Sequence, residues 1–537
     1  MRWMLTSTPN QHAKELPANW KPLLYLLPVL LLLYRWLLNH VVSGPLSRIP
    51  GPRAFALTRW RLAYEDFIGR RTQTINSLHD HYGPVVRVGP TELSFNSLSA
   101  LRTIYGAGSG FERTSFYRMF DVYGRQNLFT FAEPQRHAER KKLLSNAYAK
   151  STVASPPVSS MVEGKVAQYL ELLLREENTA SQIFQSLHYF SIDSITEFLY
   201  GPKHGGTSAL TGSEVDRALL NDILDPARRK LSWFAVHLPG YTKWILSQVG
   251  LMERFISFLG LLPMDKPTTY TGIRAHALNA WKSFKAAPPV TQKGISRTTV
   301  IGRLRSIQAD HGLEDLEIAS ELADHLLAGI DTTADSLMFL IWVLSLPQNS
   351  ALQQKLRNEC VNLPVNASGV PTCKTADQLP YLNAVIKETL RLYPPLPATE
   401  PRTSPVDIII DGYRIPAGTV VGMSPYTLHR EPSIFPEPLL FDPERWLGGE
   451  RDMGAESRRW WWAFSSGGRM CIGSHLAMAE MTTLVAALYH QYRTRVRKGF
   501  EDVSPGVTSR FEVFYDETMT KVMEHECWID FEKVNVK

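Results

Sequence analysis

The longest helical pattern of apolar residues runs from Ile318 to Leu346. Apolar side chains recur there on most sides, which predicts a helix through the core of a large domain. Its middle reads Ala328-Gly329-Ile330-Asp331-Thr332-Thr333. The Thr332 hydroxyl can bond the Ala328 carbonyl four residues earlier and loosen the helix, and the two small residues leave space beside it. Polar groups in a core helix are costly unless they are used, so this segment is a candidate site.

Shorter patterns predict the remaining elements. Strands are expected at 84–89 and 92–95, a hairpin over 406–421 around Asp411-Gly412, and a hairpin tip at 518–522. Helices are expected to begin at His137, near Leu379 and after Cys471, and 161–262 is mostly helical by period. The pattern predicts a mainly α fold with small β-sheets, an α+β architecture.

An apolar stretch near the N-terminus predicts a membrane anchor over 22–42. It follows a tail, 1–21, and precedes a proline-rich hinge, 43–52, that stops the helix. One large domain is expected over 53–537. The alternative is a cleaved signal peptide, but the apolar run starts late and no small-residue cleavage pattern follows it. Arginines after the span favour a cytoplasmic domain, as a single-pass protein would have.

Composition narrows the class of protein. The chain has 537 residues, of which 44% are hydrophobic and 20% charged, as in globular proteins. Its net charge of +6 is too mild to indicate nucleic-acid binding. The four cysteines form no C-x-x-C pair, which argues against zinc or iron–sulfur sites and against a disulfide scaffold.

Cys471 lies in a glycine-rich loop immediately before a predicted helix. A helix start favours thiolate over thiol, and glycines let the backbone approach something flat and bulky. A thiolate there is a candidate axial ligand for haem iron. Two alternatives are a buried structural cysteine and a cysteine hydrolase with His475 as base, although nothing marks an oxyanion site.

The loop carries the pattern F-x-x-G-x-R-x-C-x-G over 464–473, and this resembles the cytochrome P450 family of haem-thiolate monooxygenases. The segment 328–333 resembles the family's A/G-G-x-D/E-T-T motif. The resemblance implies that Cys471 ligates the iron of haem b and that Phe464 packs beside the thiolate. It also implies that Thr332 donates a hydrogen bond to bound dioxygen and that Asp331 supplies protons.

Three further residues match the family's bracing network. Glu388 and Arg391 form an E-x-x-R pair, and Arg445 follows in F-D-P-E-R-W. By resemblance they form a buried network that braces the haem loop. An isolated E-x-x-R is otherwise usually a surface pair.

The resemblance also implies a set of haem-propionate contacts. Arg402 and Arg469 match family positions, and guanidinium binds carboxylate well. His137 and Lys141 lie four residues apart on one helix face and match in part, because tryptophan and arginine are more usual. The alternative for that helix is a solvated basic face.

Aromatic residues crowd the segment 111–131, where they either cap the core or wall an apolar pocket. The expected substrate pocket is lined by Phe116, Phe120, Ala328, Leu396 and Ala398. Its apolar character indicates a lipophilic small-molecule substrate.

No flavin or nicotinamide fingerprint is present, so electrons must come from another protein. By resemblance the donor is NADPH through NADPH–cytochrome P450 reductase, with cytochrome b5 as a possible second donor, at the endoplasmic reticulum membrane. A basic patch would attract an acidic partner, the alternative being solvated surface charge. Its expected members are Arg140, Lys141, Lys142, Arg445, Arg451, Arg458 and Arg459.

The expected activity is insertion of one oxygen atom from O2 into a lipophilic molecule, by hydroxylation, epoxidation or further oxidation. The sequence around 428–446 resembles that of fungal family members that act in secondary metabolism. Two alternatives share the fold: an isomerase or dehydratase that needs no reductase, and a non-catalytic haem-binding membrane protein. The intact Asp331-Thr332 pair argues against both.

Overall fold

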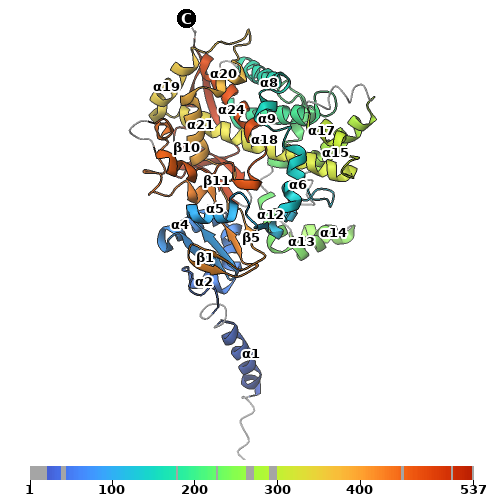
Figure 1. Cartoon of the computed structure of the whole chain (residues 1–537), viewed down its shortest axis with the longest axis vertical. Helices are drawn as coiled ribbons and strands as arrows, with labels where there is room; N and C mark the ends of the chain where they lie inside the picture. Colours follow the sequence, from blue (N-terminus) through green and yellow to red (C-terminus); the bar gives the residue numbers. More distant parts are fainter. Residues whose placement is uncertain are drawn as a thin grey trace, which may run out of the picture.

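The computed structural model describes residues 21–37, 44–176, 180–224, 228–248, 250–261, 271–288, 299–448, 453–509 and 512–534. Helices form most of this part of the chain, and small sheets lie beside them (Figure 1). The predicted mainly α architecture with small sheets is therefore confirmed.

The central element is α18 (Asp315–Ser345), which matches the predicted core helix. It begins with a capping box, in which Glu314 and Glu317 satisfy each other's free backbone N–H groups. Its flanks pack against α9 (Ile183–Tyr200), α15 (Thr271–Ala286), α21 (Pro380–Leu392) and α24 (Ser474–Gln491). A Cβ atom at Gly329 would lie 2.5 Å from Ile195 Cγ1 on α9. The small size of Gly329 therefore serves close helix packing and leaves no space for a ligand, contrary to the expectation.

The largest sheet holds the loops of the site in place. Its order is β1-β2-β8-β5-β3. The strands are β1 (Val85–Gly89), β2 (Glu92–Phe95), β8 (Val420–Gly422), β5 (Arg402–Thr403) and β3 (Glu112–Arg113). The predicted strands β1 and β2 pair antiparallel, and the predicted hairpin is β6 (Ile408–Ile410) with β7 (Tyr413–Ile415).

Two three-stranded sheets contain the remaining strands. They are β4 (Ser181–Gln182), β9 (Tyr492–Val496), β10 (Val503–Ser509), β11 (Glu512–Phe514), β12 (Lys521–Glu524) and β13 (Trp528–Lys533). The expected hairpin tip at 518–522 is wrong, because β12 pairs parallel to β10 after a turn.

The other α-helices surround this frame. They are α2 (Arg53–Leu57), α3 (Trp60–Phe67), α4 (Arg71–Tyr82), α5 (Leu98–Tyr105), α6 (Pro134–Leu144), α7 (Lys150–Val153), α8 (Pro156–Arg175), α10 (Glu214–Ala218), α11 (Asn221–Leu224), α12 (Arg228–His237), α13 (Pro239–Leu246), α14 (Leu251–Phe258), α17 (Val300–Ile307), α19 (Ser350–Cys360), α20 (Cys373–Asp377), α22 (Pro425–Leu428) and α23 (Gly454–Ser457).

Short 3₁₀ turns complete the frame. They are η3 (Ser115–Phe120), η4 (Pro347–Asn349), η5 (Pro443–Trp446), η6 (Arg458–Trp460) and η7 (Gly467–Arg469).

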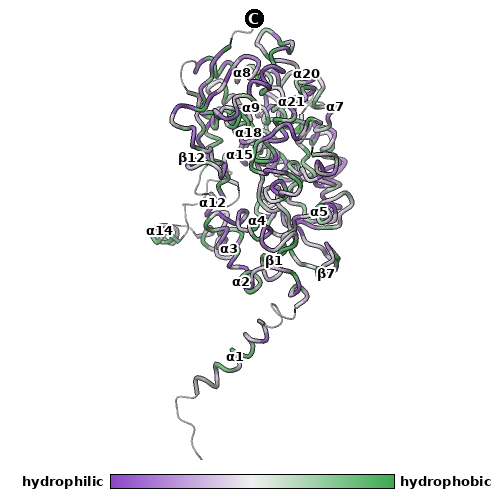
Figure 2. The backbone as a smooth tube through the Cα atoms, turned by 90° about the vertical axis from the view of Figure 1, so that its left-hand side faces the viewer, coloured by the Kyte–Doolittle hydropathy of each residue, from purple (hydrophilic) through white to green (hydrophobic). Residues whose placement is uncertain are grey.

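The N-terminal helix α1 (Lys21–Leu37) stands apart from the body in Figures 1 and 2. Its described side chains from Tyr25 to Tyr34 are apolar and exposed, Leu32 by 69%. Within the described residues, the one helix long and apolar enough to cross a membrane is α18, and 72% of its apolar window is buried. Residues 1–20 and 38–43, which belong to the predicted tail, anchor and hinge, lie outside the described residues. The anchor therefore stays a prediction.

Candidate active site

The Cys471 loop is closed by its own backbone and docked on α5. The Cys471 N–H donates to Phe464 O at 2.9 Å, and Ser466 Oγ donates to Tyr105 O at 3.1 Å. Gly467 has φ +62°, and a Cβ atom there would lie 2.4 Å from Tyr105 O. Glycine is thus required at this position by both backbone conformation and space.

The Cys471 side chain is accessible at the surface of an otherwise buried region. The surrounding protein raises the pKa of the thiol, while backbone N–H groups of Gly473 and Ser474 and the charge of Lys141 lower it. The predicted effect of the helix start is present, but desolvation by the surrounding protein outweighs it, so the loop alone does not favour the thiolate. A metal cation bound to the sulfur would hold the thiolate at neutral pH.

A cluster of positive charges lies close to this loop. The pKa of His137 falls to about 2 because of burial and the neighbouring charges of Arg469, Arg113, Lys141 and Arg402. Burial and like charges likewise lower the pKa of Arg469 to about 9 and that of Arg113 to about 10. The structure therefore brings together all four residues expected at the propionates.

Arg113 was missed in the sequence, where a single arginine in a two-residue strand gives no signal. In the sheet it pairs directly with Arg402 across β3 and β5. Like charges in direct register destabilise a sheet unless an anion lies between them.

The cationic side chains of this cluster donate hydrogen bonds mainly to neutral backbone carbonyls. Arg469 donates to the carbonyls of Phe131 (2.9 Å) and Ala132 (2.5 Å). Lys141 donates to the carbonyls of Gly468 (3.0 Å) and Met470 (2.6 Å) in the cysteine loop. Arg402 pairs with Glu400 at 2.9 Å and also donates to the Tyr117 hydroxyl. The excess of buried and partly buried positive charge fits a ligand with two carboxylates beside a sulfur-bound metal.

Beyond its exposed first turn, α18 is largely buried, but one stripe remains accessible. It consists of Asp324, Leu327, Ala328, Asp331 and Thr332, spaced i, i+3, i+4, i+7 and i+8. Thr332 Oγ1 donates to Ala328 O at 2.8 Å, as expected. The helix nevertheless continues unbroken to Ser345, so the expected local loosening is not observed.

The bracing network is present and fully buried. Arg391 forms a bidentate pair with Glu388 (2.8 and 2.9 Å), and Arg445 Nε lies 3.3 Å from the same carboxylate. The indole N–H of Trp446 and the backbone N–H of Asp442 both donate to Glu388 at 3.0 Å. This geometry excludes the surface-pair alternative for the E-x-x-R.

The comparisons with known proteins agree with this site. A sequence model described as Cytochrome P450 matches residues 292–507. Cytochrome P450 monooxygenase cypX of Dothistroma septosporum is 30% identical over 463 residues, which cover 84% of this chain and 85% of that protein. The chain belongs to the cytochrome P450 family. It is a haem-dependent monooxygenase.

Other P450 relatives match this chain with comparable sequence identity. Cytochrome P450 monooxygenase orf2 of Aspergillus niger is 28% identical over 483 residues, covering 88% of this chain and 92% of the relative. Cytochrome P450 monooxygenase tazI of Aspergillus terreus is 28% identical over 518 residues, covering 94% and 97%. The similarity thus extends well beyond the motifs.

A histidine missed in the sequence joins the P450 bracing network to the cysteine loop. His429 is fully buried, and its Nε2 accepts from the Trp462 N–H at 2.8 Å, while its Nδ1 lies 3.1 Å from Arg391 O. These contacts fix a neutral ring that donates through Nδ1. Burial, with the charge of Arg391, lowers the pKa of His429 to about 3.

The expected pocket residues of this P450 differ in position. Phe120 lines a small cavity together with Leu327 and Asp324 of α18. Its ring packs edge-on against Phe116, with 6.1 Å between centroids. Ala328 is accessible on the α18 stripe.

The two other expected pocket residues follow α21. Leu396 is 53% exposed and Ala398 is buried. Of the aromatic segment, Phe111 and Phe131 belong to the core. The core reading thus holds for Phe111 and Phe131, and the pocket reading stays a prediction.

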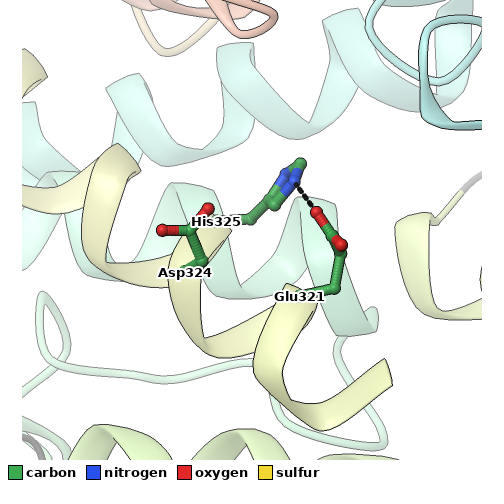
Figure 3. Close-up of side chains that lie close together, drawn as sticks. All are labelled: Glu321, Asp324 and His325. Atoms are coloured by element: carbon green, nitrogen blue, oxygen red, sulfur yellow. Dashed lines mark hydrogen bonds and ion pairs between the residues drawn. The ribbon is translucent and has the colours of Figure 1, made fainter. Parts of the chain in front are cut away.

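A cluster of potential metal ligands lies nearer the N-terminus of α18 (Figure 3). Ligand atoms of Glu321, Asp324 and His325 lie within 4.8 Å of one another. Donors and cations already occupy it, because Arg140 Nη1 lies 2.8 Å from Glu321 Oε2 and Tyr148 shares a hydrogen bond with His325 Nδ1 at 2.5 Å. The cluster is an ion network that ties α18 to α6.

The remaining sequence alternatives lose support. Across the described residues, no hydrogen bond joins His475 to Cys471, which leaves a hydrolase without its base.

Phe464 packs against the core and contacts Trp461 at 5.9 Å between ring centroids. The expected basic patch is partly wrong, since Arg140 and Arg445 are buried in ion pairs with Glu321 and Glu388.

The other members of that patch differ in position. Lys142, Arg458 and Arg459 are exposed. Lys141 donates to the cysteine loop. Arg451 lies outside the described residues.

Proposed function

We propose that this chain oxidises a lipophilic small molecule with one oxygen atom from O2, in fungal secondary metabolism. The observation that carries the proposal is the accessible stripe on α18, where Asp331 and Thr332 lie beside Ala328 in a helix that is largely core beyond its first turn. An isomerase or dehydratase with this fold has no need of a proton-donating acid and alcohol at that place.

The proposed roles follow from the contacts. Cys471 ligates haem iron through sulfur, and bound haem supplies the oxygen-activating chemistry. Arg113, His137, Lys141, Arg402 and Arg469 hold the two propionates. Glu388, Arg391 and Arg445 keep the cysteine loop in place.

On the α18 side, the accessible Asp331 carboxyl holds and releases protons. Thr332, anchored on Ala328 O, presents its hydroxyl to the reacting oxygen. Phe116, Phe120, Ala328, Leu396 and Ala398 are the proposed pocket residues for the substrate.

Electrons come from NADPH through NADPH–cytochrome P450 reductase, with cytochrome b5 as a second possible donor. The exposed cations Lys142, Arg458 and Arg459 are the proposed docking charges. The domain division 1–21, 22–42, 43–52 and 53–537 is part of the proposal, with a single span in the endoplasmic reticulum membrane and a cytoplasmic catalytic domain. The exposed apolar α1 supports it.

The first experiment tests the haem-thiolate site. The carbon monoxide difference spectrum of the reduced protein is recorded for the wild type and for Cys471→Ser. Cys373→Ser is the control, because that buried cysteine lies against Ser159 O, far along the chain from the loop. A thiolate-type Soret band that survives in Cys471→Ser would overturn the assignment.

The second experiment separates a monooxygenase from an isomerase. Lipophilic aromatic and terpenoid compounds are incubated with NADPH, reductase and ¹⁸O₂, and products are screened for one labelled oxygen. Turnover should fall in Thr332→Ala and return in Thr332→Ser, which keeps the hydroxyl. Product formed without NADPH and without label would favour the isomerase.

A further inference from the structure

A buried histidine on α9 lies between two carboxyl groups of α18. His188 Nδ1 is 2.6 Å from Phe184 O, and since a carbonyl only accepts, Nδ1 carries the hydrogen. The other nitrogen, Nε2, lies 3.7 Å from Asp331 Oδ1 and 3.8 Å from Asp335 Oδ1. The two acids are four residues apart and so share one face of α18.

One oxygen of each carboxyl is left without a partner in this site. Asp331 Oδ1 and Asp335 Oδ1 are buried and lack a hydrogen-bond partner in the described part of the chain. With both acids ionised and His188 neutral, a nitrogen lone pair would face two negative charges in a buried site. That state is strongly unfavourable, so the trio must hold at least one additional proton.

The electrostatics agree with this proton count. Burial raises the pKa of Asp335 to about 8. For His188, burial acts against protonation, but the adjacent Asp331 and Asp335 carboxyls raise its pKa above the ordinary value. Near neutral pH the three groups therefore share one or two protons, and their charges are coupled.

The trio reaches from the site to the C-terminal sheet. The Asp331 side chain is 37% exposed on the Thr332 side, whereas His188 is 1% exposed. Phe184 contacts the His188 ring and stacks on His525, with centroids 4.3 and 4.9 Å apart. Beyond His525, Glu524 pairs with Arg229 at 3.2 Å. These are the charged and titratable groups that face His188 from the neighbouring elements.

We propose that His188 and Asp335 form a proton reserve that positions and reloads the Asp331 carboxyl. When Asp331 gives a proton toward Thr332, the N–H bond at His188 Nε2 breaks and an O–H bond forms at Asp331. The imidazole becomes neutral, and a proton from solvent restores the trio. The inference rests on the proposed role of Asp331, and His188 is a positioning residue because it acts through that acid.

The test uses the full-length haem protein with NADPH, O2 and the reductase, and no added substrate. The rate of NADPH oxidation, the hydrogen peroxide formed per NADPH and the solvent deuterium isotope effect are measured. The variants are His188→Gln, which can donate a hydrogen bond but carries no mobile proton, and Asp335→Asn. The control is His276→Gln. The His276 ring belongs to α15, and its Nε2 lies 2.8 Å from Gly205 O.

In His188→Gln the rate should fall by about tenfold, less than the roughly hundredfold or more that a direct proton donor contributes. The peroxide yield and the isotope effect should rise, with an unchanged carbon monoxide spectrum. If both variants behave as the wild type while Asp331→Asn is slow, the reserve is refuted and the proposed function stands. If Asp331→Asn is also unchanged, the proposed proton role of Asp331 fails.

A second readout needs no turnover. Because the folded trio binds protons that the unfolded chain releases, its contribution to stability must fall as the pH rises from 6.5 to 8.5. The melting temperature of the wild type should therefore fall more steeply over this range than that of Asp335→Asn or His188→Gln. Equal slopes in all three proteins would overturn the proposal, even if His188→Gln lost haem.

Discussion

At the residue scale, the stability of the haem loop depends on a small number of buried charges. Glu388 and Arg391 are fully buried, and the remaining donors of Arg391 reach the carbonyls of His429, Pro438 and Leu440. Removal of one partner leaves the other charge buried and unpaired, which is costly. The network therefore stabilises the fold mainly because it fixes which loops pack together, and less because the ion pair itself is favourable.

Arg391→Ala should lower the free energy of unfolding by about 3 kcal/mol and release haem, since the fully buried Glu388 would lose its bidentate partner and keep Arg445 at 3.3 Å as a cationic partner. Arg495→Ala is the matched control, because its partner Glu532 lies 3.3 Å away and the side chains are 73% and 57% exposed. That change should cost less than about 1 kcal/mol. Urea unfolding measures both, and similar losses in the two variants would contradict the network's role.

The neutral state of His429 predicts a loss of stability in acid. The folded chain keeps this ring neutral down to a pKa of about 3, whereas the unfolded ring takes up a proton below its ordinary value of 6.5. The unfolded state thus binds more protons, and stability falls as the pH drops below 6.5. Between pH 7 and pH 5 this residue should account for about 2 kcal/mol.

Melting curves at pH 7 and pH 5 measure the effect. In His429→Gln the pH dependence should shrink, although the variant is less stable at pH 7. Exposed His311→Gln should keep the wild-type dependence. An unchanged dependence in His429→Gln would show that the ring is not held neutral.

At the scale of elements, the sequence predicts the parts whose period is strong. The core helix α18, the helix α24 and the strand pair β1–β2 follow from apolar spacing alone. It cannot predict contacts made across distant segments, such as the register of Arg113 with Arg402 or the meeting of His188 with Asp331. Those depend on how helices and strands pack, and single polar residues give no periodic signal.

The site motif also separates a required glycine from a tolerated one. Gly467 has a positive φ and no room for a Cβ atom, whereas a Cβ atom at Gly468 would meet nothing within 4 Å. Gly467→Ala should cost at least about 2 kcal/mol and weaken haem binding, because the loop must leave Tyr105. Gly468→Ala should change stability by less than about 1 kcal/mol. Haem content and melting temperature check both, and equal effects would refute this reading of the motif.

At the scale of the whole molecule, exposed large apolar side chains are most numerous in two regions. One is α1, and the other combines α13 and α14 with α3, on the same end of the body as α2 (Figures 1 and 2). Phe255 is 56% exposed and Phe258 is 85% exposed on α14. On α3, Trp60 and Phe67 are 44% and 52% exposed, and Phe67 contacts Trp233 of α12 at 5.3 Å between centroids. So much apolar surface on one end favours a body that rests on a membrane.

Removal of residues 1–42 should therefore weaken binding to phospholipid vesicles without abolishing it. In the shortened chain, Phe255→Ser with Phe258→Ser should reduce the remaining binding by at least about tenfold, because each buried phenylalanine contributes about 1.5–3 kcal/mol. Val215→Ser, at a position 80% exposed on α10, is the control and should bind like its parent. Flotation of the haem-loaded proteins with vesicles measures the bound fraction. A shortened chain that stays wholly in solution would show that α1 and its flanks are the sole membrane contact, whereas full binding after removal of 1–42 would refute the anchor.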